Sequence, residues 1–227
     1  MPCALRIGVN ALFLIPGGVG GTEIYVRNLL SALAEIDAMD EYFVFVNRET
    51  AADAEPLAPR APNFREVVCA VRAASRPARL LWEQAVLPFQ TAARRLDVLF
   101  SPGFTSPLWC AGSKVTVIHD MQHKRRPENF GALELAAWRA SVWASAHFSK
   151  RIITVSEESR RDIVEIYGVA PERVQVVRHG VEPELFRLER RDGEPPYLLS
   201  VSTIHPHKNW GRWMEAFGRL EIGRAHV

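Results

Sequence analysis

A histidine and an aspartate stand side by side in the stretch Ile118–His123, whose sequence is IHDMQH. His119 and Asp120 follow an apolar run that predicts a parallel strand, and binding sites in such sheets lie at the carboxyl ends of the strands. A histidine beside a carboxylate can carry a proton or form a hydrogen bond with a hydroxyl group. Alternatively, His119 only satisfies buried backbone groups at the strand end, and the residues alone leave both interpretations open.

His119, Asp120 and His123 together also raise the question of a metal ion. Their spacing matches no metal site that is defined by sequence, and no further ligand stands nearby. We therefore expect no metal at this position.

A glycine-rich turn occupies Pro16–Glu23, PGGVGGTE, directly before a predicted helix. Glycine lets backbone N–H groups approach a ligand, and the partial positive charge of a helix N-terminus favours a phosphate or carboxylate. After Gly20 and Gly21 the third glycine of the dinucleotide-binding fingerprint is missing, and the lysine of the ATPase phosphate loop is missing too. An anion site and a flexible strand-to-helix turn both stay open for this stretch.

The stretch Ser202–Asn209, STIHPHKN, joins a predicted strand to a predicted helix and contains Lys208. A lysine at the start of a helix can pair with a diphosphate. Most surface lysines are solvated charges, so this stretch by itself favours neither role.

Short apolar runs alternate with helical segments along the chain, and this alternation predicts the fold. Runs rich in Val, Ile, Leu and Phe are typical of strands covered on both faces. Strands that alternate with helices form parallel β-α units, so we expect an α/β fold with a doubly wound, Rossmann-like parallel sheet. The predicted strands are Leu5–Phe13, Tyr42–Val46, Arg65–Val71, Asp97–Ser101, Lys114–His119, Arg151–Ser156, Val174–Val177 and Tyr197–Ser202, and the main predicted helices are Thr22–Ile36, Arg79–Arg95, Leu133–Phe148, Glu157–Tyr167 and Trp210–Leu220.

Two residues mark the ends of the helix predicted over Glu157–Tyr167. Ser156 is expected to cap its N-terminus, and Gly168 is expected to end it. Both roles are structural.

The charged stretch Arg187–Pro196, RLERRDGEPP, has no periodicity and closes on a proline pair, which is typical of a linker. We expect a first domain over residues 1–186, a linker over 187–196 and the start of a second domain over 197–220. One strand and one helix cannot bury a core, so this second domain is predicted to be incomplete. Residues 221–227 match the translation of a common sequencing-library adapter and are expected to be a non-native tail.

Composition narrows the class of protein. The 227 residues carry a formal net charge of +2, without the strong positive field of a general nucleic-acid clamp. Cys3, Cys69 and Cys110 show no metal or redox spacing and indicate a reducing compartment. No signal peptide pattern stands at the start, and no stretch approaches the roughly 20 apolar residues of a membrane span. We therefore expect a cytoplasmic protein that binds no nucleic acid.

Four motifs, in this order, resemble the nucleotide-sugar-dependent glycosyltransferases of the group-one type. They are GGTE in the glycine turn, TVIHDMQHKRRPENF around His119, ITVSEESRRDI with the downstream RHGVEPELF, and YLLSVSTIHPHKNW before the last helix. The resemblance covers nearly the whole chain up to Leu220. It implies a retaining enzyme of the GT-B type, with two Rossmann-like domains that face each other across a cleft. This chain would supply the acceptor-side domain and the first β-α unit of the donor-binding domain.

The resemblance also implies a role for each matched residue, and the donor is a substrate, so no cofactor is implied. His119 would lie beside the acceptor and the transferred sugar. Members often carry glycine at the Ser202 position and an arginine near Thr203 or His207, so this chain departs from the pattern there. The implied catalytic residues are His119 and Asp120, and the implied donor-binding residues are Gly20, Gly21, Thr203 and Lys208.

The implied reaction moves a sugar from a nucleotide-diphosphate donor to a glycan or lipid-linked acceptor, as in polysaccharide biosynthesis. Mannose and glucose are the sugars we consider first. One alternative is a non-catalytic sugar- or nucleotide-binding module of the same fold, and another is a hydrolase or epimerase that uses His119 and Asp120. Because the donor-binding domain is incomplete, the 227-residue chain itself is expected to be inactive.

A peripheral contact with the inner face of a membrane is a further hypothesis. Residues 60–95 carry seven arginines and two glutamates, and Trp82, Trp138 and Trp143 could anchor at a lipid interface. The alternative is that these tryptophans belong to the core and the arginines are solvated.

Overall fold

A computed structural model describes residues 4–125, 127, 131–181, 198–201 and 208–219. The chain divides into two compact units, Met1–Gly180 and Val181–Val227, and each is described by itself. The linker predicted over 187–196 and the tail predicted over 221–227 lie outside the described residues. The predicted domain boundaries therefore stay a prediction.

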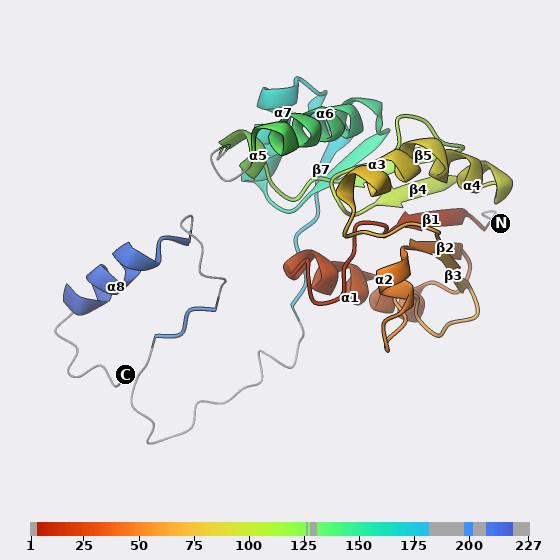
Figure 1. Ribbon diagram of the computed structural model, residues 1–227, viewed down its shortest axis with the longest axis horizontal. Coiled ribbons are helices and arrows are strands. Elements are labelled where there is room, and N and C mark those ends of the chain that lie inside the picture. Colours follow the sequence, from red (N-terminus) through yellow and green to blue (C-terminus); the bar gives the residue numbers. More distant parts are fainter. Residues whose placement is uncertain (1–3, 126, 128–130, 182–197, 202–207, 220–227) are drawn as a thin grey trace, which may run out of the picture. The chain divides into compact units, whose positions relative to one another are not determined.

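The first unit contains a seven-stranded parallel sheet in the order β3-β2-β1-β4-β5-β6-β7, which confirms the predicted α/β doubly wound fold (Figure 1). The chain starts in the middle of the sheet, winds outward to β3, crosses back to β4 and winds outward again to β7. All carboxyl ends therefore meet at one edge, and the order reverses between β1 and β4, where sheets of this kind bind ligands. The strands are β1 (Arg6–Asn10), β2 (Glu41–Val46), β3 (Phe64–Val68), β4 (Val98–Ser101), β5 (Ser113–Val117), β6 (Arg151–Thr154) and β7 (Val174–Val176).

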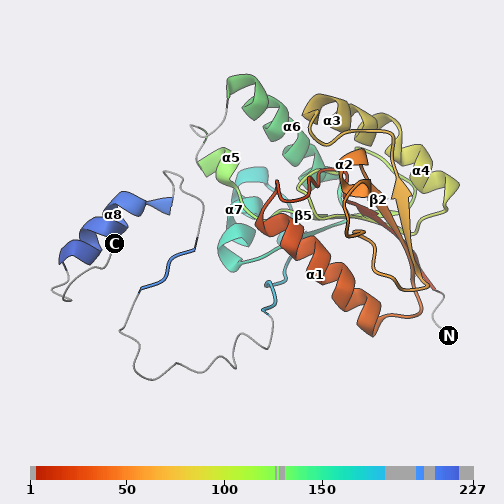
Figure 2. The ribbon, with the colours of Figure 1, turned by 60° about the horizontal axis from the view of Figure 1, so that its bottom comes forward.

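Helices cover both faces of this sheet. Successive side chains of a strand point to opposite faces, and in β2 Val44 packs in one core cluster with Leu30 of α1 while Phe45 packs in another with Leu87 of α4. Figures 1 and 2 show α1 on one side of the sheet and α3, α4 and α6 on the other. The helices of this unit are α1 (Gly21–Ile36), α2 (Arg48–Ala51), α3 (Arg76–Ala85), α4 (Leu87–Ala93), α5 (Gln122–Arg125), α6 (Ala132–Phe148) and α7 (Glu157–Tyr167).

The single helix predicted over Arg79–Arg95 is wrong, because the structure has two helices there, α3 and α4, which meet at Val86. Pro88 lies in the first turn of α4. Proline has no N–H to donate to the preceding turn, and its ring clashes with the carbonyl four residues earlier, so one continuous helix cannot pass through it. The ends predicted for α7 are confirmed: the Ser156 side chain accepts a hydrogen bond from the N–H of Ser159, and Gly168 ends the helix at φ 65°.

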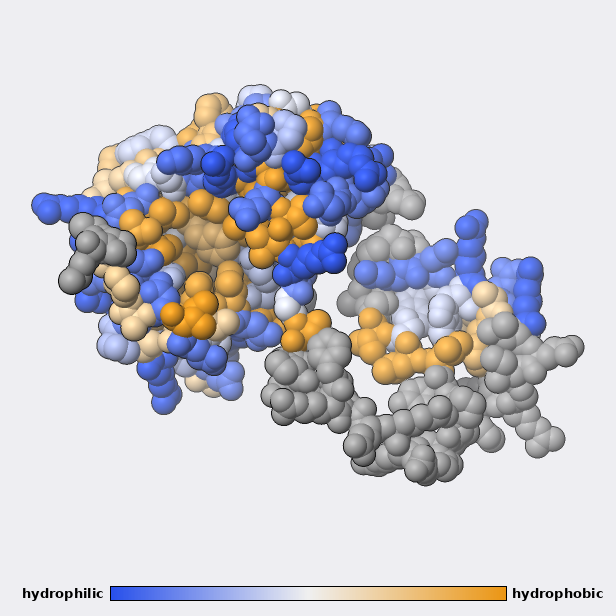
Figure 3. Space-filling view, turned by 180° about the vertical axis from the view of Figure 1, so that it is seen from behind, coloured by the Kyte–Doolittle hydropathy of each residue, from blue (hydrophilic) through white to orange (hydrophobic). Residues whose placement is uncertain are grey.

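The second unit contains α8 (Trp210–Arg219), as predicted, but residues 198–201 form no strand. A strand needs a neighbour to take its backbone hydrogen bonds, and the described residues of this unit offer none. Leu199 and Val201 are 76% and 85% exposed, and α8 buries none of its residues. Figure 3 shows hydrophobic side chains at the surface of this unit.

Candidate functional site

A cavity of about 220 Å³ lies in the first unit at the carboxyl edge of the sheet. Its walls come from the segments that follow β1, β3 and β4, together with the first residues of α1 and α3 and the middle of α6. This is the edge, and the reversal point between β1 and β4, at which the topology predicts a site. The lining residues are Phe13, Ile15, Val19, Thr22, Ala73, Arg76, Arg79, Gly103, Phe104 and Trp138.

The glycine turn contributes to this wall. Gly20, at φ 60° and ψ −130°, is the N-cap of α1, and this conformation is open to glycine and strained for other residues. Gly21 is the first residue of α1, and Val19 and Thr22 on either side of the pair line the cavity. The structure thus places the glycine pair beside the cavity, while its contact with a donor diphosphate stays a prediction.

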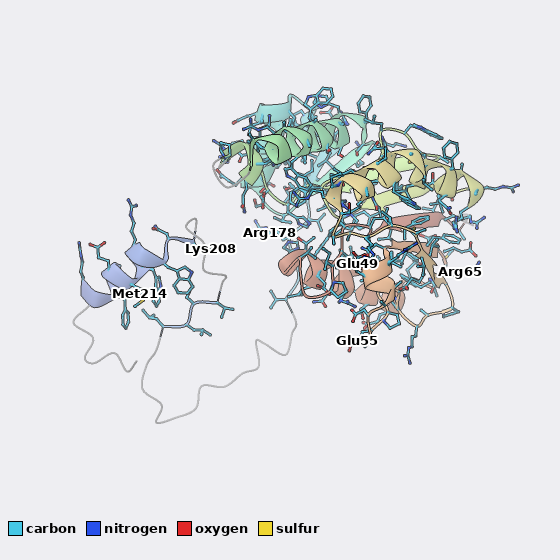
Figure 4. The ribbon with its side chains drawn as sticks, in the orientation of Figure 1. Glu49, Glu55, Arg65, Arg178, Lys208 and Met214 are labelled. Atoms are coloured by element: carbon cyan, nitrogen blue, oxygen red, sulfur yellow. The ribbon has the colours of Figure 1, made fainter. Side chains whose placement is uncertain are left out.

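Two carboxylates hold the walls in shape. Glu23 in α1 accepts a hydrogen bond from the N–H of Gly17 at 2.8 Å and fixes the glycine turn. Glu49 in α2 (Figure 4) accepts hydrogen bonds from the N–H groups of Ala73 and Ala74 at 3.1 and 3.2 Å. Because Ala73 lies three residues before the start of α3, Glu49 fixes the point from which that helix leaves.

His119 follows β5 at the same edge and sits among aromatic rings. The ring centroids of Tyr25, Phe104 and His179 lie 5.2, 5.3 and 5.6 Å from its own. Its Nε2 lies 3.0 Å from the carbonyl oxygen of Pro102, and because that oxygen can only accept, Nε2 must carry the proton. Burial, the largest cause, and the nearby His179 lower the pKa of His119. Both effects favour the neutral ring, and in the tautomer that carries its proton on Nε2 the Nδ1 lone pair can accept a hydrogen bond.

Phe104 joins the His119 cluster to the cavity, because its side chain lines the cavity and also contacts the histidine ring. Its backbone adopts φ 69°, which is unusual for a bulky residue, and its N–H donates to the carbonyl of Val117 at 3.2 Å. Strained backbone of this kind occurs preferentially at binding sites, where the surrounding structure holds it in place.

Asp120 contacts different residues from its neighbour His119. Its two carboxylate oxygens accept hydrogen bonds from the backbone N–H and the side-chain amide of Gln122, at 3.0 and 3.2 Å, at the start of α5. The two residues interact through charge, since Asp120 raises the pKa of His119 against the stronger effect of burial. The structure brings both predicted residues to the sheet edge, and a catalytic role for either stays a prediction.

Lys208 lies in the second unit, two residues before α8, and its side chain is exposed (Figure 4). Thr203 lies outside the described residues. Their expected contacts with a donor diphosphate stay predictions.

The region around His119 also contains residues that the sequence analysis did not predict. Tyr25 comes from α1, and His179 follows β7, so both reach the edge where His119 lies. His179 could have been found by the rule that identified His119 as a candidate, because it too is a histidine just beyond a parallel strand. Arg79 belongs to the arginine-rich stretch that predicts a solvated or membrane-facing surface, yet it is only 4% exposed.

The tryptophans of the membrane hypothesis occupy different environments. Trp82 and Trp138 are partly buried against the core clusters, and Trp143 is 47% exposed. None of the helices in the described ranges has the length and apolar content that crossing a membrane would need. Contact with a membrane stays a hypothesis.

The described residues contain no group of three or more His, Cys, Asp and Glu side chains that could hold a metal ion. Cys69 and Cys110 are free thiols, and burial raises the pKa of Cys69 to about 12.

The doubly wound sheet with its cavity at the reversal point defines a Rossmann-like domain of the kind found in GT-B glycosyltransferases. The model of Glycosyltransferase Family 4 matches residues 19–185, and the chain belongs to that family. This finding confirms the resemblance that the four motifs indicate.

Curated relatives support the same family. The chain is 25% identical over 224 residues to a D-inositol 3-phosphate glycosyltransferase of Thermobispora bispora, an alignment that covers 85% of this chain and 50% of the relative. It is 23% identical over 238 residues to the enzyme of the same name from Streptosporangium roseum, with coverages of 91% and 53%. The chain thus spans about half the length of the curated relatives it matches.

Solved structures share the fold. WaaG, a glycosyltransferase involved in lipopolysaccharide biosynthesis, superposes with a TM-score of 0.52 at 13% identity, over 78% of this chain and 46% of that one. A UDP-N-acetylglucosamine 2-epimerase also gives a TM-score of 0.52, at 10% identity, over 82% and 52%. Because a transferase and an epimerase fit equally well, the fold alone does not decide the chemistry.

Proposed function

We propose that this chain is the acceptor-side half of a retaining glycosyltransferase that moves a hexose from a nucleotide-sugar to a hydroxyl group of a glycan or lipid-linked acceptor. Membership of the family supports glycosyl transfer in general. The observation that carries the proposal for this chain is the placement of His119, whose Nε2 lies 3.0 Å from the carbonyl oxygen of Pro102 and whose ring contacts Phe104 in the wall of a cavity of about 220 Å³.

The geometry of His119 suits a reaction at a sugar hydroxyl. Its Nδ1 can accept a hydrogen bond from a hydroxyl of the acceptor or of the transferred sugar, and the bond to Pro102 fixes the ring orientation. Preorganised groups of this kind stabilise charge in the transition state without having to reorganise. The rings of Tyr25 and Phe104 cover the sides of the imidazole and limit the access of water, which would otherwise hydrolyse the donor.

The leaving diphosphate needs positive charge. We assign this role to Lys208 and to the N–H groups at Gly20 and Gly21, where α1 begins. Closure of the donor-binding half over this half would bring the two sets of groups to one substrate. The choice of mannose or glucose, and of the nucleotide, belongs to the donor-binding half.

The test uses a two-domain version of the protein, with the chain extended to the length of its curated relatives. It is incubated with UDP-, GDP- and ADP-sugars and with candidate acceptors, which include D-inositol 3-phosphate and lipid-linked glycans. We expect release of nucleoside diphosphate that depends on one acceptor, together with a glycosylated product of unchanged anomeric configuration, followed by mass spectrometry and NMR.

Three outcomes would contradict the proposal. Tight nucleotide-sugar binding without product would indicate a binding module. Conversion of the nucleotide-sugar without an acceptor would indicate an epimerase, and cleavage of glycosides without a nucleotide-sugar would indicate a hydrolase. An inverted product would overturn the retaining mechanism while leaving the transfer itself in place.

A further inference from the structure

Arg79 is a buried arginine whose Nη1 has no hydrogen-bond partner among the described residues. Its residue is 4% exposed, it lines the cavity, and its guanidinium makes no hydrogen bond with any residue that the structure describes. Its nearest charged partner is Glu83, one turn later in α3, with 3.6 Å between Nη1 of Arg79 and Oε2 of Glu83. The two side chains form an ion pair at this distance, but the distance is too long for a hydrogen bond. Nη1 is therefore a buried donor without an acceptor among the described residues.

Glu83 holds Arg79 from behind the cavity wall. It is fully buried and does not line the cavity. Its Oε2 accepts hydrogen bonds from Asn10 and Thr105 at 3.1 and 3.2 Å, which fix the carboxylate in place. Burial is the largest cause that lowers the pKa of Arg79 and raises that of Glu83, and the charge of each partner acts against the effect of burial on the other.

Other groups at this wall are also positive. Arg76 lines the cavity as the first residue of α3, with its guanidinium 5.5 Å from the ring centroid of Trp138. The first turn of α3 contains no acidic residue, so the helix N-terminus adds partial positive charge. Buried polar groups in native proteins are nearly always hydrogen-bonded, and the group that best satisfies a guanidinium fork is an oxyanion.

We propose that the cavity is a subsite for a small oxyanion, a phosphate or a carboxylate, which Arg79 binds through its donors on the cavity side while Glu83 orients the guanidinium from behind. The cavity, at about 220 Å³, is smaller than the roughly 300–1,000 Å³ of pockets for drug-sized ligands, so it takes one group or one sugar ring. Assigning that group to the acceptor rests on the proposed function. The subsite would make the enzyme selective for an anionic acceptor.

Binding to the 227-residue chain tests the subsite directly. Three probes share a hexose ring: glucose is neutral, glucuronate carries a carboxylate, and glucose 6-phosphate carries a phosphate. At constant ionic strength we expect at least one anionic probe to bind about tenfold or more tightly than glucose, as measured by NMR titration. The probe that binds more tightly identifies the anion.

The variants locate the effect. Arg79→Gln should reduce the affinity for the anionic probe to the affinity for glucose. Arg65→Gln, a matched change at an exposed arginine of β3 (Figure 4), should leave the affinity for the anionic probe unchanged. Because Arg79→Gln leaves Glu83 buried without its partner, the double variant Arg79→Met with Glu83→Gln removes both charges together. In the wild-type chain, the Nε–H resonance of Arg79 should also shift when the anionic probe binds, which needs no variant.

Equal binding of all three probes to the wild-type chain would overturn the subsite, and so would an anion preference that survives in the folded double variant. These measurements do not depend on transfer. Anion binding by a protein without transferase activity would support the subsite and contradict the proposed function. Sugar transfer by a protein that shows no preference for the anionic probes would support the proposed function and overturn the subsite.

Discussion

The ring of His179 lies 5.6 Å from the ring of His119, at an angle of 34° between their planes. Tyr25 contacts both, with centroid distances of 4.8 Å to His179 and 5.2 Å to His119. The three side chains come from the segment after β7, from α1 and from the segment after β5. Burial is the largest cause that lowers the pKa of His119, and the nearby ring of His179 lowers it further.

Replacing His179 by alanine should therefore raise the pKa of His119. The change removes the coulombic effect of His179 on His119 and lets water closer to the ring, and both changes favour the protonated form of His119. NMR titration of the His119 ring protons measures the shift. His147→Ala is the matched control, because His147 lies on α6 and pairs with Trp143 instead. An unchanged His119 pKa in the His179 variant would show that the two rings are not coupled.

The two glycines of the turn should respond differently to alanine. Neither would place a new Cβ within 4 Å of another group, but Gly20 has φ 60° while Gly21 lies in the first turn of α1. Gly20→Ala should lower the free energy of unfolding by about 1–3 kcal/mol through backbone strain, and Gly21→Ala should change it little or raise it slightly. Urea denaturation compares them, and equal effects would contradict the conformation described for the turn.

The stability of the fold should fall between pH 6.5 and pH 4 because of His123. Its Nε2 lies 2.6 Å from the hydroxyl oxygen of Tyr167, and burial lowers its pKa from 6.5 to about 4. Between these values the unfolded chain binds a proton that the folded chain does not, so the free energy of unfolding falls as the pH falls. We expect a loss of about 1–2 kcal/mol after allowance for solvent screening.

Denaturant titrations at several pH values check this prediction. His123→Gln should remove this part of the pH dependence, although it also lowers stability at pH 7. If the free energy of unfolding depends on pH equally steeply in the variant and in the wild type, other groups cause the pH dependence.

The elements that could be predicted from the sequence are those whose pattern is local. The strands of the first unit are continuous apolar runs, and their cores lie within the predicted ranges from β1 to β7. The ends of α7 followed from the capping chemistry of Ser156 and Gly168. The strand predicted over Tyr197–Ser202 has the same apolar character, but residues 198–201 lack a pairing partner, and pairing is not encoded in the segment itself.

The candidate site was predictable only in part. His119 stands at a strand end, which the sequence shows. The pairing of Arg79 with Glu83 joins residues one helical turn apart, but the hydrogen bonds that Glu83 accepts come from distant segments, from Asn10 and Thr105. Without that contact Arg79 resembles the exposed arginines around it.

The 227-residue chain by itself should transfer no sugar. Its second unit contains α8 and no strand among the described residues, so we expect no nucleotide pocket to assemble there. Transfer is assayed with the purified chain after mass spectrometry has excluded any longer species. Detectable sugar transfer by the purified chain would contradict the expectation.

The central claim is that His119 acts at the sugar and does not merely fill the strand end. In the two-domain version, His119→Ala should lower the single-turnover rate by about 10²–10³, the usual cost of one lost transition-state contact. Donor affinity and thermal stability, measured on the same preparation, should change little, and His147→Ala should keep normal turnover. A folded His119→Ala variant with near-normal turnover would contradict the account, as would a loss of activity that only follows the loss of folded protein.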